Sequence, residues 1–406
     1  MGGDPQDEKN RRQEQERDQH PRTREPFQDF EGNGMSAVAP PPVLRPLDLA
    51  IVPEVDAFIA SLGSGRLDPA SASDPLGRND IWSGRTDQGR AIFVKRIAGR
   101  IGGRERFDRS VSFERFADAT GLFAPRRGRL IGEDPEHRLL AFDHVEARTG
   151  AHLMIEEAFD EDLAADAGAL VGQLHSTAVP AGLELDRTQG IFPPVEFLHG
   201  LPAGAFQASS AGELAAWRLL QHDRELVQAL TGLRRDERQV DPVPSHGDLR
   251  VDQFLVTEGE SGPALHLTDW EEFRLSDPAR DVGAFAGEWL FRGVLDIVTD
   301  RGEAAFVDVE FTHDVVLERG AAKLQRLLPL VRSFWASYRQ VRPVVDPGLS
   351  TRATAFAGWH LIDRLIAGAT RTSRLSGIER AAAGIGRNAL LSPDRFADVL
   401  GLGDLS

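Results

Sequence analysis

Two segments in the second half of the chain carry acidic side chains next to apolar runs. The first, residues 245–256, reads SHGDLRVDQFLV and places the amide of Gln253 five residues after the carboxylate of Asp248. The second, residues 265–272, reads LHLTDWEE and has Asp269 directly after its β-rich run. Carboxylate and amide oxygens are the ligands that hard cations such as Mg²⁺ prefer. The spacing therefore predicts two neighbouring strand ends that present oxygen ligands to one divalent cation.

A phosphoryl-transfer site needs three oxygen-bearing groups in this order along the chain. One carboxylate lies beside the incoming hydroxyl, an oxygen ligand for the metal follows shortly after, and a second carboxylate comes from a neighbouring strand. Asp248, Gln253 and Asp269 would supply these three groups. His246 and Gly247 would shape the tight loop that presents Asp248, the histidine by hydrogen bonds and the glycine by its permissive backbone.

A lysine stands out upstream because the chain contains only three lysines. Lys95 ends the β-rich run AIFVK, which follows a hairpin turn at residues 87–89. A helix is expected over about residues 104–119, and Glu114 lies on it, 19 residues after Lys95. A lysine in a structured apolar setting is a candidate functional residue.

The pattern of strands and helices predicts an α+β fold in two parts behind a tail. Residues 1–34 are rich in charge, Gln and Pro, and are expected to be disordered. Residues 35–148 contain one N-terminal helix, the strands of a small antiparallel sheet and the helix that carries Glu114. Residues 149–406 change to long helical segments. Apolar positions at helical spacing open this second part: Leu163, Ala167, Leu170, Val171 and Leu174.

Composition narrows the classes of partner. The net charge of -16 repels a phosphate backbone, so no nucleic-acid partner is expected. Cysteine is absent, which excludes disulfides and thiolate metal sites. No stretch approaches the length of apolar sequence that crosses a bilayer, so we expect a cytoplasmic protein without membrane contact.

The acidic segments resemble those of the aminoglycoside phosphotransferase and choline kinase family, relatives of the protein kinases. That family carries His-Gly-Asp, then Asn after four residues, later Asp-Trp/Phe-Glu, and then Asp-Pro with an Asp three residues on. The matching residues here are His246-Gly247-Asp248, Asp269-Trp270-Glu271, and Asp277-Pro278 with Asp281. The resemblance covers about residues 70–370. It implies a two-lobed protein-kinase-like fold, with a small antiparallel-sheet N-lobe that binds ATP or GTP with Mg²⁺ and a mostly helical C-lobe that carries the catalytic and metal-binding loops.

The same resemblance implies roles for residues of the first part. Lys95 would contact the α- and β-phosphates and would be held by Glu114. Three residues would belong to the loop that covers the nucleotide: Gly77, Arg78 and Asn79. Two residues, Asp143 and Val145, fall in the linker between the lobes, whose backbone holds the adenine in this family.

One departure from the family concerns the metal ligand. Gln253 stands where the family has Asn, and Asp252 stands where Gly is common. A Gln amide oxygen can bind Mg²⁺, but the metal demands near-octahedral geometry. This change has three interpretations. The loop is shifted, Asp252 assists in binding the metal, or the chain is a catalytically silent binding module.

Two short sequence motifs favour one type of acceptor for the phosphoryl group. The run GRND at residues 77–80 and DLRxDQF at residues 248–254 resemble the phosphotransferase-like components of class V lanthipeptide and thioamitide biosynthesis. That resemblance implies phosphorylation of a Ser or Thr hydroxyl on a precursor peptide, with a separate lyase as partner protein. A small-molecule hydroxyl, on an aminoglycoside, a choline-like amine or a sugar, is the alternative substrate.

Overall fold

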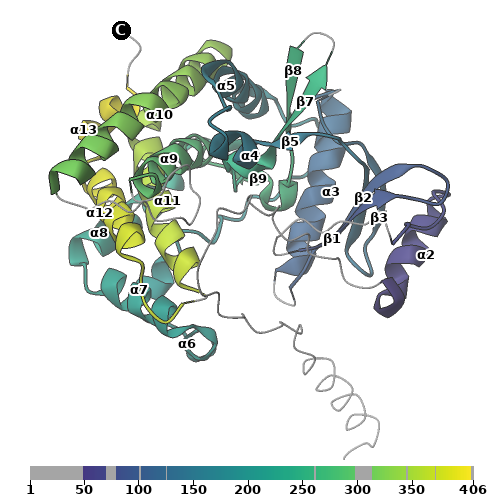
Figure 1. Cartoon of the computed structure of the whole chain (residues 1–406), viewed down its shortest axis with the longest axis horizontal. Coiled ribbons are helices and arrows are strands. Elements are labelled where there is room, and N and C mark those ends of the chain that lie inside the picture. The colour runs from purple at the N-terminus through teal and green to yellow at the C-terminus, as the bar shows by residue number, and fades with distance from the viewer. Residues whose placement is uncertain are drawn as a thin grey trace, which may run out of the picture. The chain divides into compact units, whose positions relative to one another are not determined.

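The structure is a computed structural model (Figure 1). It describes residues 49–69, 79–99, 102–124, 126–259, 262–297, 313–343, 346–370 and 372–403, with side chains from residue 318 onward in the sixth range. The expected tail over residues 1–34 lies outside these ranges, and so do Gly77 and Arg78. Residues 44–406 form one compact unit. The expected division near residue 148 stays a prediction.

A four-stranded antiparallel sheet occupies the first part of the described chain (Figure 1). Its strand order is β1-β2-β4-β3. The strands are β1 (Asp80–Arg85), β2 (Ala91–Arg96), β3 (Leu130–Asp134) and β4 (Leu139–Asp143). A short 3₁₀ turn, η1 (Leu49–Ile51), precedes helix α2 (Pro53–Ser61). Val55 and Ile59 of α2 pack with Trp82 and Val94 of the sheet, so this lobe has a small apolar core of its own.

Helix α3 (Gly103–Thr120) joins this sheet to the rest of the chain. It ends at Gly121, whose φ of 69° is the left-handed conformation that commonly terminates helices. Phe107 of α3 packs with Leu140 of the sheet, whereas Phe113 of α3 belongs to the large cluster that runs through the helical part. The two sides of one helix therefore contact two different cores.

Short strands and 3₁₀ turns position the acidic segments. β6 (Val243–Ser245) pairs antiparallel with β9 (Arg274–Ser276). A second sheet has the order β5-β7-β8. Its strands are β5 (Arg148–Thr149), β7 (Phe254–Gly259) and β8 (Gly262–Leu267), and the two turns are η3 (Val251–Gln253) and η4 (Trp270–Glu272).

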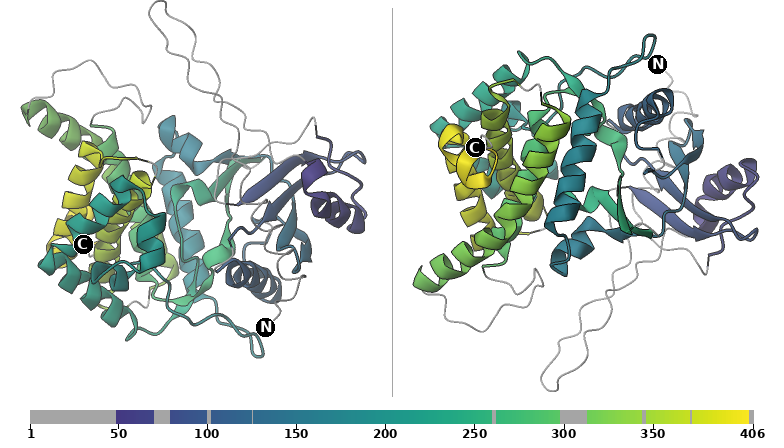
Figure 2. Two further views of the ribbon diagram at one scale, coloured as in Figure 1. Left: turned by 90° about the horizontal axis from the view of Figure 1, so that it is seen from below. Right: turned by 90° about the horizontal axis from the view of Figure 1, so that it is seen from above.

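Helices make up most of the remaining chain, as the sequence pattern predicts. They are α4 (Gly150–Ile155), α5 (Glu161–Ser176), η2 (Val195–Leu198), α6 (Ala203–Ala208), α7 (Ala211–Gln221), α8 (Arg224–Glu237), α9 (Ala279–Leu295), α10 (His313–Val341), α11 (Leu349–Ala369), α12 (Gly377–Leu391) and α13 (Pro393–Leu400). α10 lies along α5, and α11 lies between α9 and α12 (Figure 2). None of the helices in the described ranges has the length and apolar character that crossing a membrane requires.

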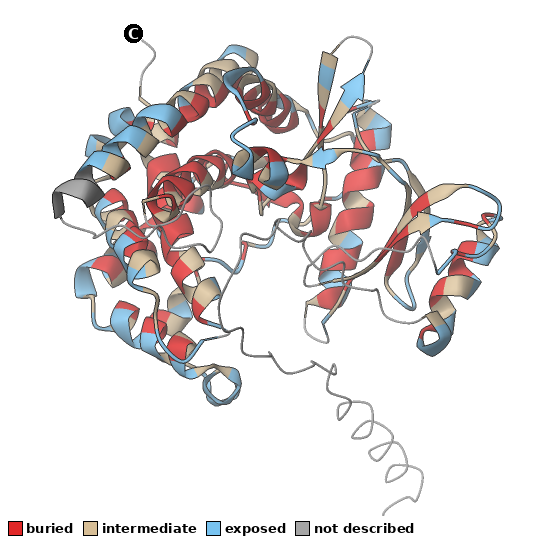
Figure 3. Ribbon diagram, in the orientation of Figure 1, coloured by how far each residue is buried: buried red, intermediate tan, exposed pale blue. Residues whose placement is uncertain are grey.

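The large core centres on α9 and α11, whose ribbons are mostly buried (Figure 3). Phe285 of α9 is fully buried and stacks on Phe334 of α10, with 4.0 Å between ring centroids. Phe285 also meets Phe254, the first residue of β7, edge to face. The helical core therefore supports the strand that follows Gln253.

Removing the Phe285 ring is expected to destabilise the fold strongly, because no other group fills the buried space. We expect Phe285→Ala to lower the free energy of unfolding by about 3–5 kcal/mol. Phe206→Ala, at an exposed ring of α6, is the control and is expected to change it by no more than about 0.5 kcal/mol. Urea denaturation of both variants measures the difference, and equal losses would contradict this account of the core.

Candidate active site

The loop after β6 is held by the carboxylate of one aspartate. Asp281, in the first turn of α9, accepts the backbone N–H of His246 at 2.7 Å and that of Gly247 at 2.9 Å. The ring of His246 is buried, and its Nε2 lies 2.8 Å from the backbone oxygen of Thr268. Because three fixed contacts define the start of this loop, Asp248 is presented in one orientation.

A histidine of helix α5 in turn contacts the carboxylate of Asp281. Oδ2 of Asp281 lies 3.0 Å from Nε2 of His175, and Nδ1 of His175 lies 3.0 Å from the hydroxyl of Tyr338. Burial alone would raise the pKa of Asp281, but the hydrogen bond from His175 and the backbone N–H of Gly247 bring it below the ordinary value. Burial lowers the pKa of His175. Helices α5, α9 and α10 therefore all contribute to the position of the loop.

Gly247 is required by two features of this loop. Its φ is 84°, in the left-handed region that side chains disfavour. A Cβ at this position would lie 2.5 Å from the backbone oxygen of Glu272. The glycine therefore lets the loop pass close to the turn η4, which carries the second acidic segment.

Asp248 lies in a half-buried position beside charged neighbours. Burial raises the pKa of Asp248, the carboxylate of Asp269 raises it further, and the guanidinium of Arg250 opposes both. Arg250 is in turn paired with Asp252, with 2.7 Å between its Nη2 and Oδ2. A carboxylate with a raised pKa beside a second carboxylate is an arrangement found at sites of proton transfer.

Asp269 lies where β8 ends and η4 begins. Its backbone adopts the left-handed conformation, with φ 68° and ψ 57°, which is uncommon for a residue with a side chain. Its Oδ1 accepts a hydrogen bond from Nζ of Lys95. Lys95 therefore reaches from the small sheet to the second acidic segment, and the structure brings Asp248, Asp269 and Lys95 together.

Gln253 is placed beside Asp269 by the pairing of β7 with β8. The backbone oxygen of Gln253 accepts hydrogen bonds from both N–H and Oγ1 of Thr268, each at 3.0 Å. Gln253 is buried, with 6% of its surface exposed. An amide oxygen and a carboxylate at the same strand ends are hard donors of the type that suits Mg²⁺. In the described part of the chain, no group of three or more His, Asp or Glu side chains is placed to hold a metal ion.

Lys95 has two acidic partners, and neither is the one that the sequence predicts. Its Nζ contacts Asp269 and lies 3.2 Å from Oε2 of Glu271. Burial would lower the pKa of Lys95, but the two carboxylates raise it above the ordinary value. The expected pair between Lys95 and Glu114 is not formed. Glu114 instead pairs with Arg127, and Glu271 lies next to the lysine.

Three residues were expected in the nucleotide-covering loop, and the structure describes one of them, Asn79. Its Nδ2 donates to Oε2 of Glu271 at 2.7 Å, and its Oδ1 accepts the backbone N–H of Ala98 at 2.9 Å. It lies directly before β1 and joins the group around Lys95. The role of Gly77 and Arg78, outside the described residues, stays a prediction.

The linker residues have their side-chain contacts within the small lobe. The carboxylate of Asp143 pairs with Nη2 of Arg90 at 2.7 Å and with Nε of Arg129 at 2.9 Å. Its backbone N–H donates to the oxygen of Arg129, and Val145 follows in the half-buried connection to β5. The backbone N–H of Asp143 is thus already used, and adenine contact by Asp143 and Val145 stays a prediction.

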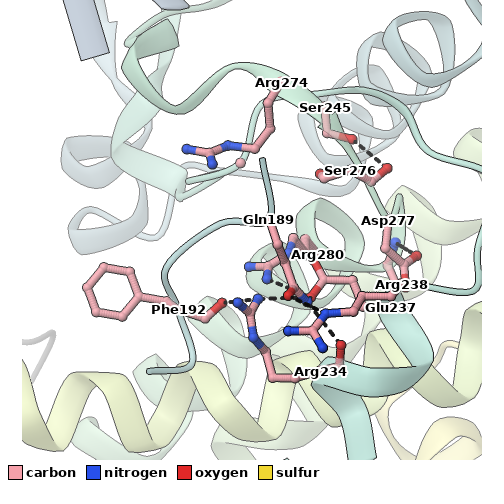
Figure 4. A network of polar contacts seen from close by, with 12 residues as sticks. Gln189, Phe192, Arg234, Glu237, Arg238, Ser245, Arg274, Ser276, Asp277 and Arg280 are labelled. Atoms are coloured by element: carbon pink, nitrogen blue, oxygen red, sulfur yellow. Dashed lines mark hydrogen bonds and ion pairs between the residues drawn. The ribbon is translucent and has the colours of Figure 1, made fainter. Parts of the chain in front are cut away.

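A buried network supports the site from the side of α8 and the start of α9 (Figure 4). Glu237 accepts hydrogen bonds from Arg280, from Nη1 of Arg234 at 2.9 Å, and from the amide of Gln189. Burial would raise the pKa of Glu237, but these donors hold it below the ordinary value. Because Arg280 precedes Asp281, the network also fixes the residue that orients the loop.

Comparison with known proteins identifies the family. The fold is that of the kinase-type phosphotransferases. The model of the phosphotransferase enzyme family (APH) matches residues 79–315, more than half of the chain, and the chain belongs to this family. None of the curated protein sequences matches the chain at a significant level.

Comparison with solved structures identifies the fold. An amicoumacin kinase, hAmiN, in complex with AMP-PNP, Ca²⁺ and Ami, is 11% identical with a TM-score of 0.52 and covers 86% of this chain and 94% of its own. A choline/ethanolamine kinase family protein from Mesorhizobium loti is 16% identical with a TM-score of 0.48, covering 87% and 100%. Spectinomycin phosphotransferase, in complex with ADP and spectinomycin, is 12% identical with a TM-score of 0.47, covering 86% and 96%. The likeness to the first of these shows the two-lobed protein-kinase-like fold.

The raised pKa of Glu114 makes a pH-dependent contribution to stability. Burial is the main cause, and it raises the pKa from 4.5 to about 7, while Arg127 opposes it. Because the folded state binds this proton more tightly than the unfolded state, the contribution is fully present below about pH 4.5. It is lost as the pH rises through about 7.

Glu114→Gln should remove this dependence. We expect the free energy of unfolding of the native chain, relative to the variant, to fall as the pH rises from about 4.5 to about 7. Urea denaturation at several pH values measures it, and Glu105→Gln, exposed on the same helix, is the control. A difference between native chain and Glu114→Gln that is constant over this range would contradict the assignment.

Proposed function

We propose that the chain transfers the γ-phosphoryl group of ATP or GTP to a hydroxyl group in a reaction that needs Mg²⁺. The observation that carries this proposal is the convergence of Asp248, Asp269 and Lys95 from three separate elements. Such an arrangement catalyses mainly by positioning and by neutralising charge.

Asp248 is assigned the place beside the acceptor hydroxyl. Its carboxylate orients the hydroxyl and takes up its proton as the oxygen bonds to phosphorus. Burial and Asp269 raise the pKa of Asp248, so the carboxylate holds a proton more readily than an exposed one. The hydrogen bonds that the backbone N–H groups of His246 and Gly247 donate to Asp281 keep the loop in place during the transfer.

Lys95, Gln253 and Asp269 are assigned to the nucleotide and its metal. Lys95 binds phosphate oxygens with its ammonium group. Asp269 and Gln253 would hold Mg²⁺ between the phosphates, where a divalent cation supplies charge neutralisation of the phosphoryl group. The burial of Gln253 and its backbone hydrogen bonds with Thr268, the residue before Asp269, support this role.

For the acceptor we propose a Ser or Thr hydroxyl of a precursor peptide, with a lyase as the next enzyme to act. The support is the amino-acid sequence of the loop from Asp248 to Phe254 and of residues 77–80, which resembles the phosphotransferase-like components of class V lanthipeptide and thioamitide biosynthesis. A small-molecule hydroxyl is the second candidate, and the named substrate of the amicoumacin kinase structure favours it. Mass spectrometry after incubation with ATP, Mg²⁺ and both kinds of candidate separates them by the mass of one added phosphate.

Asp248→Asn tests the role of the first carboxylate. The amide cannot accept the proton, so we expect kcat to fall by about 10²-fold or more. Binding of Mg²⁺·AMP-PNP, measured by calorimetry, is expected to stay within a few-fold of the native value because Lys95 and Asp269 remain. Transfer at the native rate by this variant would refute the assignment.

Metal removal and Gln253→Ala test the metal site. Chelation with EDTA is expected to abolish the rise in melting temperature that ATP with Mg²⁺ produces. Gln253→Ala is expected to raise the Mg²⁺ concentration for half of this effect by about tenfold or more, since one ligand is lost. Gln207→Ala, at an exposed residue of α6, is the control. An unchanged Mg²⁺ requirement in Gln253→Ala would exclude Gln253 as a ligand.

A further inference from the structure

A cavity lies between helices α4, α5, α9 and α10, apart from the residues assigned to phosphoryl transfer. Its volume is about 390 Å³, within the range of about 300–1,000 Å³ that ligand pockets have. Five apolar side chains contribute to its lining: Met154, Phe159, Trp289, Leu327 and Leu330. None of its described lining residues has a role in the proposed transfer, so that reaction alone does not account for the cavity.

Two buried side chains that line this cavity have N–H groups without a hydrogen-bond acceptor. Trp289 is 1% exposed, and its Nε1 has no hydrogen bond within the described part of the chain. Arg292 is 6% exposed, and its Nε lies 2.9 Å from Oδ1 of Asp296. Its Nη2 has no hydrogen bond to any residue of the described ranges. Because buried donors without acceptors are unfavourable and rare, a ligand with carbonyl oxygens would supply what these two side chains lack.

The charges around the cavity favour a basic ligand over an anionic one. Five acidic residues and two arginines line it, and three of the acids are the consecutive, exposed residues 160–162 at the start of α5. Asp296 already neutralises Arg292, so a neutral carbonyl suits this arginine better than a second carboxylate does. The excess of acids attracts Lys or Arg side chains and repels phosphate groups.

The cavity is close to the loop that carries out the proposed transfer. Phe159, one of its lining residues, meets Phe254 edge to face with 6.5 Å between ring centroids. Helix α4 packs against the turn η3 so closely that a Cβ on Gly150 would collide with the backbone oxygen of Val251. Each residue of an extended peptide adds about 3.3–3.6 Å, so a peptide with a hydroxyl beside Asp248 has other residues that reach the cavity. A small-molecule acceptor has no such residues to place there.

We propose that this cavity binds a segment of the acceptor peptide that flanks the phosphorylated Ser or Thr. A large apolar side chain of the peptide fills the apolar part of the cavity, and peptide carbonyl oxygens accept hydrogen bonds from Trp289 and Arg292. A neighbouring Lys or Arg of the peptide pairs with the acids at the start of α5. The proposal rests on the proposed function for the peptide acceptor. It places the choice of peptide in residues that take no part in the transfer itself.

A peptide library tests the selection that the cavity would impose. The probe is a mixture of synthetic peptides with one central Ser and random residues at the other positions. The native chain is incubated with this mixture, ATP and Mg²⁺, and the phosphorylated peptides are sequenced by mass spectrometry. We expect enrichment of a large apolar residue together with Lys or Arg at one fixed distance from the Ser. Phosphorylation without enrichment at any position would overturn the proposal.

Two variants connect this selection to the cavity. Met154→Trp fills part of the space and is expected to raise KM for the enriched peptides by about tenfold or more, with a smaller effect on kcat. Asp162→Lys reverses one charge of the lining and is expected to remove the enrichment of Lys and Arg. Because Asp162 is exposed, this variant provides the test if Met154→Trp does not fold.

Glu105→Lys is the matched control for the charge reversal. Glu105 is exposed in the first turn of α3, as Asp162 is in the first turn of α5, and it does not line the cavity. We expect this variant to select the same peptides as the native chain. Native selection in both cavity variants, or the same loss of selection in Glu105→Lys, would contradict the proposal.

Photo-crosslinking measures binding at the cavity without phosphoryl transfer. The probe is a synthetic Ser peptide that carries benzoylphenylalanine between two Lys residues, and a peptide with Glu in place of both Lys is its control. Benzophenones react readily with methionine side chains on irradiation, and Met154 lines the cavity. We expect adducts on Met154 with the Lys peptide and their loss with the Glu peptide.

The two measurements separate the peptide site from the proposed function. A chain that phosphorylates small molecules but forms no adduct on Met154 would overturn the peptide site and leave the phosphotransferase activity in place. Adducts on Met154 in a chain that phosphorylates no acceptor would refute the proposed function and leave the peptide site established.

Discussion

The arrangement depends most on one buried ammonium group and the two carboxylates that neutralise it. Lys95 is 9% exposed, and a buried charge without partners is strongly unfavourable. Asp269 and Glu271 come from the turn after β8, whereas Lys95 comes from β2. The need to pair this charge therefore joins the small sheet to the helical part. The stacking of Phe113 on Trp270 adds apolar contact at the same junction.

A second buried carboxylate organises the other half of the site. Asp281 accepts hydrogen bonds from the backbone N–H groups of His246 and Gly247, and Nε2 of His175 contacts the same carboxylate. Each partner offsets part of the cost of burying Asp281, so the loop, the helix α9 and the helix α5 must fold together. The position of Asp248 is thus set by groups that lie behind it in the helical core.

The sequence predicted the acidic loops better than it predicted the partner of Lys95. Asp269 follows β8, which pairs with the adjacent strand β7, and such local pairing is indicated by residue spacing. Asp248 follows β6, which pairs with the more distant β9, and its motif predicted it without that pairing. The choice between Glu114 and Glu271 depends on how α3 is rotated against the turn η4, which only tertiary packing decides. A separation of 19 residues between Lys95 and Glu114 contains no information about that rotation. The change from a small antiparallel sheet to long helical segments was predicted from strand and helix periodicity.

The turn η4 brings two acids, separated by one tryptophan in the sequence, to the same lysine. Trp270 is buried, and its Nε1 donates to the backbone oxygen of Leu267 at 3.2 Å, which fixes the indole in the core. Asp269 is in the left-handed conformation, and this conformation allows its carboxylate and that of Glu271 to reach the same ammonium. Two carboxylates of one short turn therefore neutralise the buried ammonium group of Lys95.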